Sequence, residues 1–337
     1  MNTSTAKVVR FHELGDASVL KIETLPVTEA GENELRIKVD AIGLNRAEVM
    51  FRTGTYLETP QLPSRLGYEA VGVVEAVGEN VTEFKIGDSV STVPAFSMGQ
   101  YGVYAEHAVV PVHAVVKSPA SFSAEQSASI WMQYLTAYGA LVELGKLEQE
   151  QHVLITAASS SVGVAAIQLA KTVGAVVIAT TRGESKKQFL LEQGADHVIQ
   201  TDTEDLVSSM DEITHGQGAN LIFDPIGGPI LNQLAEASAT GGLIIEYGAL
   251  DEAQTPYPLF IALAKGLSIR GFTLFEITQD KEKLENAKAY LLPYFEAKKL
   301  VPVIAKVFSF DQIQQAHEYM ESNQQMGKIV VSLKKAK

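Results

Sequence analysis

The pattern of hydrophobic and polar positions divides the chain into regions of two different designs. In the first third, short apolar or alternating runs are separated by turn residues such as Gly15-Asp16 and Gly87-Asp88. This pattern predicts strands joined by tight turns, and many such strands favour a barrel or a folded sheet. We expect strands at 7–11, 19–25, 34–44, 68–78, 88–93 and 104–110, and one short helix at about 46–52.

A different rhythm begins near residue 124. Small and apolar residues at three- and four-residue spacing predict a helix over 121–145, after which strands and helices alternate. The expected strands are 151–158, 175–180, 195–199, 219–227 and 241–248, and the expected helices are 161–174, 184–194, 203–215 and 229–238. Uniformly apolar strands separated by helices predict a parallel sheet covered on both faces, which is the doubly wound, dinucleotide-binding arrangement.

The last segment has a looser pattern, with strands at 267–274, 303–310 and 327–333 and helices at 281–299 and 311–322. We expect it to return to the β-rich domain. The prediction is therefore an α/β protein of two domains, which a length of 337 residues also favours. A β-rich substrate domain takes residues 1–124 and 267–337, and a doubly wound (Rossmann) dinucleotide-binding domain takes residues 125–266.

Composition and charge exclude several classes of protein. With 46% hydrophobic and 20% charged residues the chain is globular, and its net charge of −13 argues against a nucleic-acid partner. The absence of cysteine excludes disulfides and thiolate metal sites. The N-terminus does not resemble a signal peptide, and no apolar run approaches the ~20 residues that span a bilayer. We therefore expect a cytoplasmic protein with a small-molecule substrate and no membrane partner.

Residues 154–163 run from a predicted strand into a predicted helix. Small residues there allow the backbone to approach a pyrophosphate, which the free N–H groups of the helix start would bind. The usual three-glycine pattern is degraded, because Ala158 and Ser160 replace the first two glycines and only Gly163 remains. A strand–helix turn without a ligand is the alternative, and the strand–helix–strand context favours the cofactor.

The next predicted strand ends at Thr181 and Arg182, about where an NAD site would place an acidic residue. Arg182 and Lys186 instead suit the 2′-phosphate of NADPH. Glu184 is contrary evidence, and the lysines could simply solvate the start of a helix. We predict NADPH as the cofactor.

With these residues in place, the sequence resembles the zinc-independent, quinone oxidoreductase-like branch of the medium-chain dehydrogenase/reductase superfamily. The resemblance covers nearly the whole chain and lies in blocks whose order and spacing are specific. The blocks are residues 43–56, 66–90, 135–141, 155–171, 241–250 and 327–331. It implies a GroES-like fold for the β-rich domain and a homodimer formed through edge strands near 241–270.

The resemblance also shows what this chain lacks. Zinc-dependent relatives carry Gly-His-Glu where this chain reads Gly67-Tyr68-Glu69, and the seven histidines show no metal-ligand spacing. We therefore expect no metal. Gln133 replaces a lysine of some quinone reductases, which weakens any assignment to a particular quinone.

The resemblance implies roles for individual residues. Thr136 would contact the nicotinamide and its ribose, Tyr247 and Gly248 would lie under that ribose, and the backbone of Phe272, Thr273 and Leu274 would meet the carboxamide. The remaining implied or predicted cofactor contacts are Ser160, Ser161, Val162, Gly163, Thr181, Arg182, Lys186 and Lys328.

Without metal, catalysis requires a donor for the oxygen on which negative charge develops as hydride arrives. Our candidates are Tyr56 first, Asn45 second and Tyr68, at the vacated zinc-ligand position, third. Each has a structural alternative, because a tyrosine can simply pack its ring and Asn45 can cap the following helix. Phe51, Phe96, Met132 and Phe275 are expected to line an apolar substrate pocket, although they could equally be core residues.

The predicted function is transfer of hydride from NADPH to a quinone or other activated carbonyl, with a one- or two-electron outcome left open. One alternative is reduction of the double bond of a 2-alkenal, enone or enoyl thioester, which Tyr56 would favour as a proton source. The other is a non-catalytic NADPH-binding protein.

Overall fold

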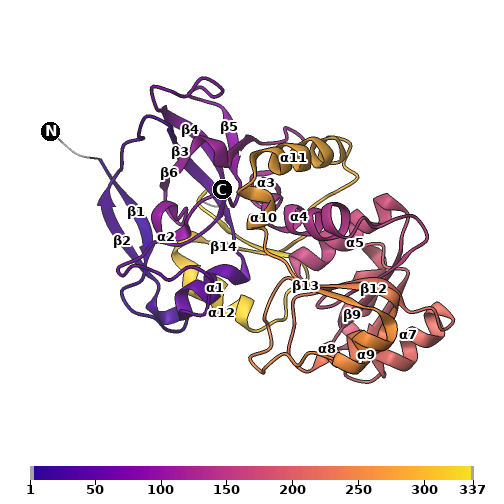
Figure 1. The fold of residues 1–337 in the computed structure, drawn as a ribbon. Coiled ribbons are helices and arrows are strands. Elements are labelled where there is room, and N and C mark those ends of the chain that lie inside the picture. The colour runs from indigo at the N-terminus through magenta and orange to yellow at the C-terminus, as the bar shows by residue number, and fades with distance from the viewer. Residues whose placement is uncertain (1–3, 335–337) are drawn as a thin grey trace. The chain divides into compact units, whose positions relative to one another are not determined.

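The computed structural model describes residues 4–334 and divides into two units (Figure 1). The first, here called the N/C unit, contains the residues up to Met132 and those from Val301 on; the second, the nucleotide unit, is Gln133–Leu300. Each unit is built around its own sheet. The expected α/β fold class is confirmed.

The N/C unit contains a seven-stranded sheet in the order β14-β15-β3-β4-β5-β7, in which β6 also pairs with β3. The strands β1 and β2 form a separate antiparallel pair. The strands are β1 (Thr5–Arg10), β2 (Lys21–Pro26), β3 (Glu34–Gly43), β4 (Glu69–Val77), β5 (Ser89–Thr92), β6 (His107–Pro111), β7 (Val115–Lys117), β14 (Ile304–Ser309) and β15 (Lys328–Ser332). Its helices are α1 (Arg46–Thr53), α2 (Met98–Tyr101), α3 (Ala124–Ser127) and α12 (Ile313–Glu321).

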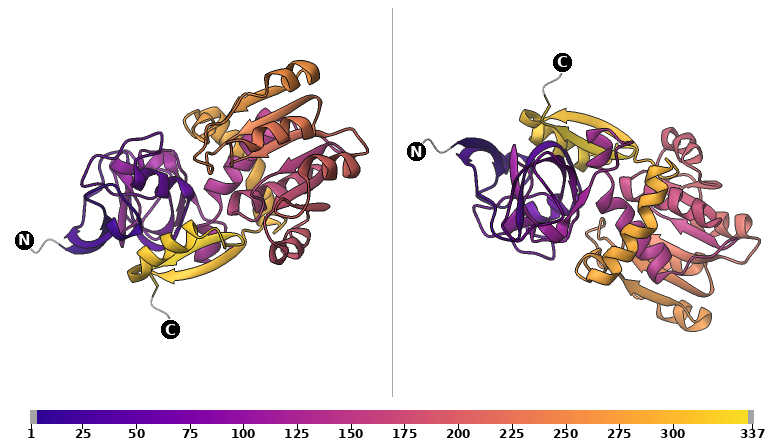
Figure 2. Two further views of the ribbon diagram at one scale, coloured as in Figure 1. Left: turned by 90° about the horizontal axis from the view of Figure 1, so that it is seen from below. Right: turned by 90° about the horizontal axis from the view of Figure 1, so that it is seen from above.

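The C-terminal segment returns to this sheet as expected. β15 pairs antiparallel with β3 at its Gly43 end, and β14 pairs parallel with β15. Both views of Figure 2 show these yellow strands beside the indigo and purple strands of the same unit. A side chain at Gly43 would overlap the Ala128 carbonyl oxygen, at 1.9 Å from its Cβ. The close approach of strand and chain at this point therefore requires glycine.

The nucleotide unit contains a six-stranded parallel sheet in the order β10-β9-β8-β11-β12-β13. The strands are β8 (His152–Ile155), β9 (Val176–Thr181), β10 (His197–Gln200), β11 (Ala219–Asp224), β12 (Ser238–Glu246) and β13 (Ser268–Gly271). The helices are α5 (Ser161–Val173), α6 (Lys187–Glu192), α7 (Leu206–Thr214), α8 (Ile230–Ala237), α9 (Leu259–Lys265), α10 (Phe275–Thr278) and α11 (Lys281–Glu296); α4 (Trp131–Tyr138) begins before the unit boundary. The strand order reverses between β8 and β11, where doubly wound sheets bind ligands at the carboxyl ends of the strands.

Alternation along the strands gives the two faces of this sheet different neighbours. Leu154, Ile222 and Ile244 share a buried cluster with residues of α7 and α8, and α7, α8 and α9 lie together in Figure 1. Residues two positions further along these strands therefore point to the same face. This places Thr156, Asp224 and Glu246 in one row at the carboxyl edge.

Two boundaries and one helix differ from the prediction. Residues 125–132 fall in the N/C unit rather than in the dinucleotide-binding domain. Residues 267–300 fall in the nucleotide unit rather than the β-rich one, because β13 pairs in parallel with the exposed edge of β12. The helix expected over 121–145 is divided into α3, α4 and a π-helical stretch at Gly139–Leu144. Close packing accompanies that stretch, since a Cβ at Gly139 would lie 2.5 Å from Cζ of Phe272.

Candidate functional site

The turn from β8 into α5 has the geometry of a phosphate-binding loop. The Ser160 hydroxyl caps α5 by accepting from the Gly163 amide at 3.1 Å. A Cβ at Gly163 would lie 2.4–2.6 Å from the backbone of Ala158, so only glycine permits this crossing of strand and helix. Ser161 and Val162 form the first turn of a 13-residue helix, whose free N–H groups and dipole suit an anion. The loop therefore fits a dinucleotide pyrophosphate despite its missing glycines.

The carboxyl end of β9 brings two cations together. Burial lowers the pKa of the Lys186 ammonium, and repulsion from the nearby Arg182 guanidinium lowers it further. Glu184, the contrary evidence in the sequence, accepts a hydrogen bond from Gln200 Nε2 at 2.6 Å. Asp202 accepts from the Gly183 amide at 3.1–3.2 Å. Both acids therefore have hydrogen-bond donors of their own beside the cation pair.

Across β8, β11 and β12, the row of Thr156, Asp224 and Glu246 was not predicted from the sequence. Asp224 is fully buried; its Oδ1 accepts from the Thr156 hydroxyl, and its Oδ2 accepts from the amides of Ile226 (3.1 Å) and Gly227 (2.7 Å). Glu246 is the register partner of Asp224 on β12. Burial, and then the adjacent Asp224 carboxylate, raises the pKa of Glu246 to about 8.

The opposite face at this edge carries Tyr247, whose ring stacks on Phe223 with centroids 3.9 Å apart. Burial and the Asp224 charge raise the pKa of the Tyr247 phenol, and the adjacent Ser160 side chain opposes the shift. A Cβ at Gly248 would approach the Pro225 carbonyl oxygen to 2.7 Å. The predicted contacts Ser160, Tyr247 and Gly248 thus lie at one edge of the sheet.

Other predicted cofactor residues of the nucleotide unit are more dispersed. The Phe272 amide donates to the Glu246 carbonyl at 2.8 Å, which ties the segment after β13 to the end of β12. Phe272, Leu274, Thr136 and Thr181 are buried, and Thr273 and Arg182 are exposed. Their contacts with a cofactor stay predictions.

In the N/C unit, Lys328 and Asn45 belong to a buried charge cluster. The Lys328 ammonium is fully buried and donates to Asn45 Oδ1 at 2.6 Å and to Glu69 Oε2 at 2.5 Å. Glu69 Oε1 accepts from the Met132 amide at 2.9 Å. The Lys328 ammonium thus binds Asn45 and Glu69 of its own unit, and the cofactor contact implied by the resemblance stays a prediction.

Glu48 completes this cluster and caps α1. It accepts hydrogen bonds from the Asn45 amide, from Asn45 Nδ2 at 3.1 Å and from the Tyr68 amide at 3.2 Å. Burial raises its pKa to about 7 against the opposing pull of Lys328 and these donors. Asn45 Nδ2 also donates to the Gly43 carbonyl at 3.2 Å, so the side-chain amide of Asn45 has a structural role at the start of this helix.

Aromatic residues gather beside this cluster. Tyr68 lies between Tyr56 (ring centroids 6.5 Å apart, edge to face) and Phe96 (5.7 Å). Burial raises the pKa of Tyr56 to about 12, with the Tyr68 hydrogen bond opposing the shift, and burial also raises the pKa of Tyr68. Phe51, by contrast, is fully buried against Phe11 and packs as a core residue. Tyr56, Tyr68 and Phe96 therefore join Asn45, Lys328 and Met132 as predicted residues that this unit brings together.

The sequence analysis missed Glu48, Glu69, Thr156, Asp224 and Glu246 as members of these clusters. Glu48 had a visible signal, because an asparagine followed three residues later by glutamate is typical of a helix start. Asp224 and Glu246 had a weaker one, since both lie within a few residues of the carboxyl ends of predicted strands of a parallel sheet. Lys328 and Glu69 are 259 positions apart, and their pairing was not visible without the fold.

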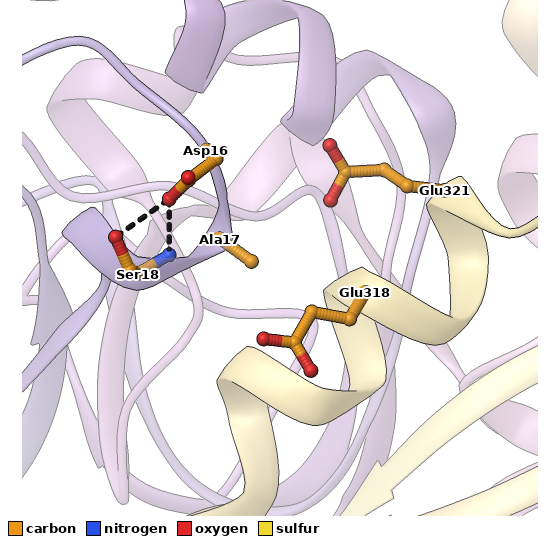
Figure 3. Close-up of a pocket in the computed structure, with 5 residues that line it drawn as sticks. All are labelled: Asp16, Ala17, Ser18, Glu318 and Glu321. Carbon is orange, nitrogen blue, oxygen red and sulfur yellow. Dashed lines mark hydrogen bonds between the residues drawn. The ribbon is translucent and has the colours of Figure 1, made fainter.

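Acidic side chains also line a separate surface hollow of the N/C unit, shown in Figure 3. Its residues are Asp16, Ala17, Ser18, Glu318 and Glu321. Asp16 is satisfied locally by the Ser18 amide and hydroxyl, and Glu321 pairs with Arg52 at 2.9 Å. None of the predicted site residues lines this hollow. Within residues 4–334, no three His, Asp or Glu side chains are grouped so that they could hold a metal ion.

Comparisons with known proteins agree with this geometry. Residues 31–120 match the family model described as alcohol dehydrogenase GroES-like domain, and residues 161–289 match the model described as zinc-binding dehydrogenase. Human quinone oxidoreductase is 32% identical over 314 residues, which cover 93% of each chain.

Two solved structures extend the likeness to the whole fold. The Escherichia coli quinone oxidoreductase complexed with NADPH is 29% identical with a TM-score of 0.89, over 97% of this chain and 100% of that one. A structure described as an NAD-dependent alcohol dehydrogenase is 30% identical with a TM-score of 0.90, over the same shares. Fold and site thus define an oxidoreductase that uses a nicotinamide cofactor. The chain belongs to the quinone oxidoreductase-like branch of the medium-chain dehydrogenase/reductase superfamily.

Within residues 4–334, no helix is both long and apolar enough to cross a membrane.

Proposed function

We propose that this protein is an NADPH-dependent, zinc-independent reductase that transfers hydride to a quinone or another activated carbonyl. The observation that carries the cofactor choice is the Arg182–Lys186 pair at the end of β9, where the Arg182 guanidinium disfavours the charge of the Lys186 ammonium. A 2′-phosphate between them would relieve this repulsion, whereas a ribose hydroxyl would not. The E. coli relative is described with NADPH, although another similar structure is described as NAD-dependent.

Isothermal titration of the protein with NADPH and NADH tests this choice. We expect NADPH to bind at least tenfold more tightly, on the order of the 1.4 kcal/mol that one charge-assisted contact supplies. Replacing Arg182 or Lys186 with alanine should remove most of this preference and leave NADH binding nearly unchanged. Lys187→Ala is the matched control and should retain it. Equal affinity of the unmodified protein for both nucleotides would refute the NADPH assignment.

The N/C unit supplies the groups proposed to act on the substrate. Because the pKa of Tyr56 is raised to about 12, its phenol keeps its proton at working pH and can donate a hydrogen bond to a developing oxyanion. The cofactor, when bound, supplies the hydride, and the ring faces of Tyr68 and Phe96 suit a flat, conjugated acceptor.

Tyr56 also favours a second candidate activity, reduction of the double bond of enones, 2-alkenals or enoyl thioesters. That reaction needs a proton at the α-carbon or enolate in addition to the hydride. Turnover with a quinone panel and an enone panel distinguishes the two activities. Tyr56→Phe should cut enone reduction by about 10²-fold and quinone reduction by less. Tight NADPH binding with no turnover on either panel would instead indicate a non-catalytic NADPH-binding protein.

We also propose a homodimer that is formed through the β13 edge of the nucleotide unit. The preceding segment and α9 expose a run of large apolar side chains, with Phe260 84% and Leu263 69% accessible. Such a run beside an unpaired strand edge suits a second copy of the chain. Light scattering should give twice the chain mass for the unmodified protein. Phe260→Asp should lower the measured mass toward that of one chain. Ile86→Asp, which changes an exposed apolar residue of the N/C unit, is the control and should leave the mass unchanged.

The cytoplasmic location stays a prediction.

A further inference from the structure

The acid pair at the carboxyl edge of the parallel sheet is unusual in how its charge is balanced. Asp224 and Glu246 are register partners on neighbouring strands, so their side chains lie on the same face. Three donors, all neutral, satisfy Asp224: one hydroxyl and two amides. Glu246 Oε1, however, is buried and has no hydrogen-bond partner among residues 4–334.

No cation among residues 4–334 forms an ion pair with either acid. From β13, Arg270 is paired with Glu276 at 2.5 Å. From α9, Lys265 donates to the carbonyls of Glu236 and Ser238, at the opposite end of β12. The loops at this edge contribute Thr255 near Gly227 and the further acid Asp251 near Gly228, whereas Tyr247 lies on the opposite face, stacked on Phe223. The polar groups around Glu246 are therefore neutral or acidic.

We propose that Glu246 holds a proton when the dinucleotide is bound, so that the nucleotide-binding edge carries one negative charge instead of two. The inference rests on the proposed function, because it assumes that a dinucleotide lies at this edge. Thr156 links Asp224 directly to the phosphate-binding loop, and Tyr247 adjoins Ser160 at the helix cap. A pyrophosphate at that loop would add negative charge near the pair. Glu246 is thus a positioning residue that sets cofactor affinity.

The inference has a measurable consequence through proton linkage. The pKa of Glu246 is already raised to about 8 by burial and by Asp224. A bound anion disfavours the ionised carboxylate further, so above pH 8 binding must draw a proton from solvent onto Glu246. Affinity should therefore be constant below about pH 7.5 and should fall as the pH rises above 8.

The test is titration of the full-length protein with NADPH at pH 7.0, 8.0, 9.0 and 9.5. For the unmodified protein, we expect affinity to fall on the order of tenfold between pH 7.0 and 9.5. Glu246→Gln, a neutral isostere, should bind as tightly as the unmodified protein at pH 7.0 and should keep most of that affinity at pH 9.5. Calorimetry at pH 8.5 in two buffers of different ionisation enthalpy should show proton uptake that Glu246→Gln loses.

Controls separate this inference from other titrations. Glu252→Gln removes an exposed acid from the following loop and should retain the pH dependence. Titration of Lys186 would weaken binding of every variant alike, and repeating the series with NADH, which lacks the 2′-phosphate, removes that contribution. Glu246→Ala serves as a second neutral variant if glutamine distorts the edge.

The outcomes are distinct. Parallel pH curves for the unmodified protein and for both Glu246 variants would overturn this inference and leave the proposed cofactor site standing. No binding of either nucleotide at any pH would overturn the proposed function, and this inference with it.

Discussion

The two units each bury a pair of carboxyl groups, but they balance the charge differently. In the N/C unit, Glu69 and Glu48 share one buried cation, the Lys328 ammonium. In the nucleotide unit, neutral donors alone satisfy Asp224, and no cation within residues 4–334 forms an ion pair with Glu246. The second acid of each pair has a raised pKa, about 7 for Glu48 and about 8 for Glu246.

This difference shows two ways in which a buried negative charge can be balanced, by a cation or by a proton. Desolvation raises the pKa of both Glu48 and Glu246, and a nearby cation opposes it only for Glu48. Where the fold supplies a cation, the acid pair is fixed and suits a structural role. Where the fold supplies no cation, a bound proton neutralises one of the two acids, and a bound anion can change the affinity of that acid for its proton.

The largest expected effect comes from removing the cation of the first pair. Lys328→Met leaves Glu69 buried without its partner, and we expect the free energy of unfolding to fall by about 3–5 kcal/mol. Urea unfolding can be followed by the fluorescence of Trp131, the only tryptophan of the chain, which adjoins the Met132 amide bound to Glu69.

Two further variants check the cause. Lys328→Met combined with Glu69→Gln should recover a substantial part of the loss, because the uncompensated charge is gone. Lys38→Met, at an exposed position on β3, should change stability by less than about 0.5 kcal/mol. A Lys328→Met protein as stable as the original would mean that the cation does not balance this cluster.

A smaller effect is expected from the neutral donors of the second pair. Thr156→Val removes the hydroxyl that binds Asp224 while keeping a similar shape, and should cost about 1–3 kcal/mol. Thr156→Ser keeps the hydroxyl and should recover most of this loss in thermal unfolding. Equal melting temperatures of the valine and serine variants would show that this hydrogen bond contributes nothing.

The two pairs also show what the sequence could and could not predict. Strand–helix alternation over 151–248 predicted the parallel sheet, because periodicity reflects local burial. The phosphate loop followed from small residues at a strand–helix junction, and its remaining Gly163 is where the structure requires one. These features depend on residues that are neighbours in the chain.

Features that depend on distant residues were missed or placed differently. The family resemblance implied that Lys328 contacts a cofactor. It gave no information about the pairing of Lys328 with Glu69, which lies on a different strand of the same sheet. The boundary expected at Gly266 moved to Val301 because β13 pairs with β12, and strand pairing is not encoded in the pattern of either strand alone. For Asn45, the sequence left both helix capping and catalysis open. In the structure, its backbone and side-chain amides donate to the Glu48 carboxylate at the start of α1.

The smallest expected effect has the opposite sign to the first. At pH 7, Glu246 is protonated in the folded protein but ionised in the unfolded chain, where its pKa is near 4.5. The folded state therefore binds more protons, and this residue lowers stability as the pH rises from about 4.5 to about 8. Because the side chain is only partly buried, we expect Glu246→Gln to stabilise the ligand-free protein by only about 1 kcal/mol at pH 7. At pH 4.5 the gain should nearly vanish, since Glu246 is then protonated in the folded protein and about half protonated in the unfolded chain. Thermal unfolding of both proteins from pH 4.5 to 8.5 measures this difference. A Glu246→Gln protein less stable than the original at pH 7 would mean that Glu246 is ionised in the fold and that an unrecognised cation balances it, as Lys328 balances Glu69.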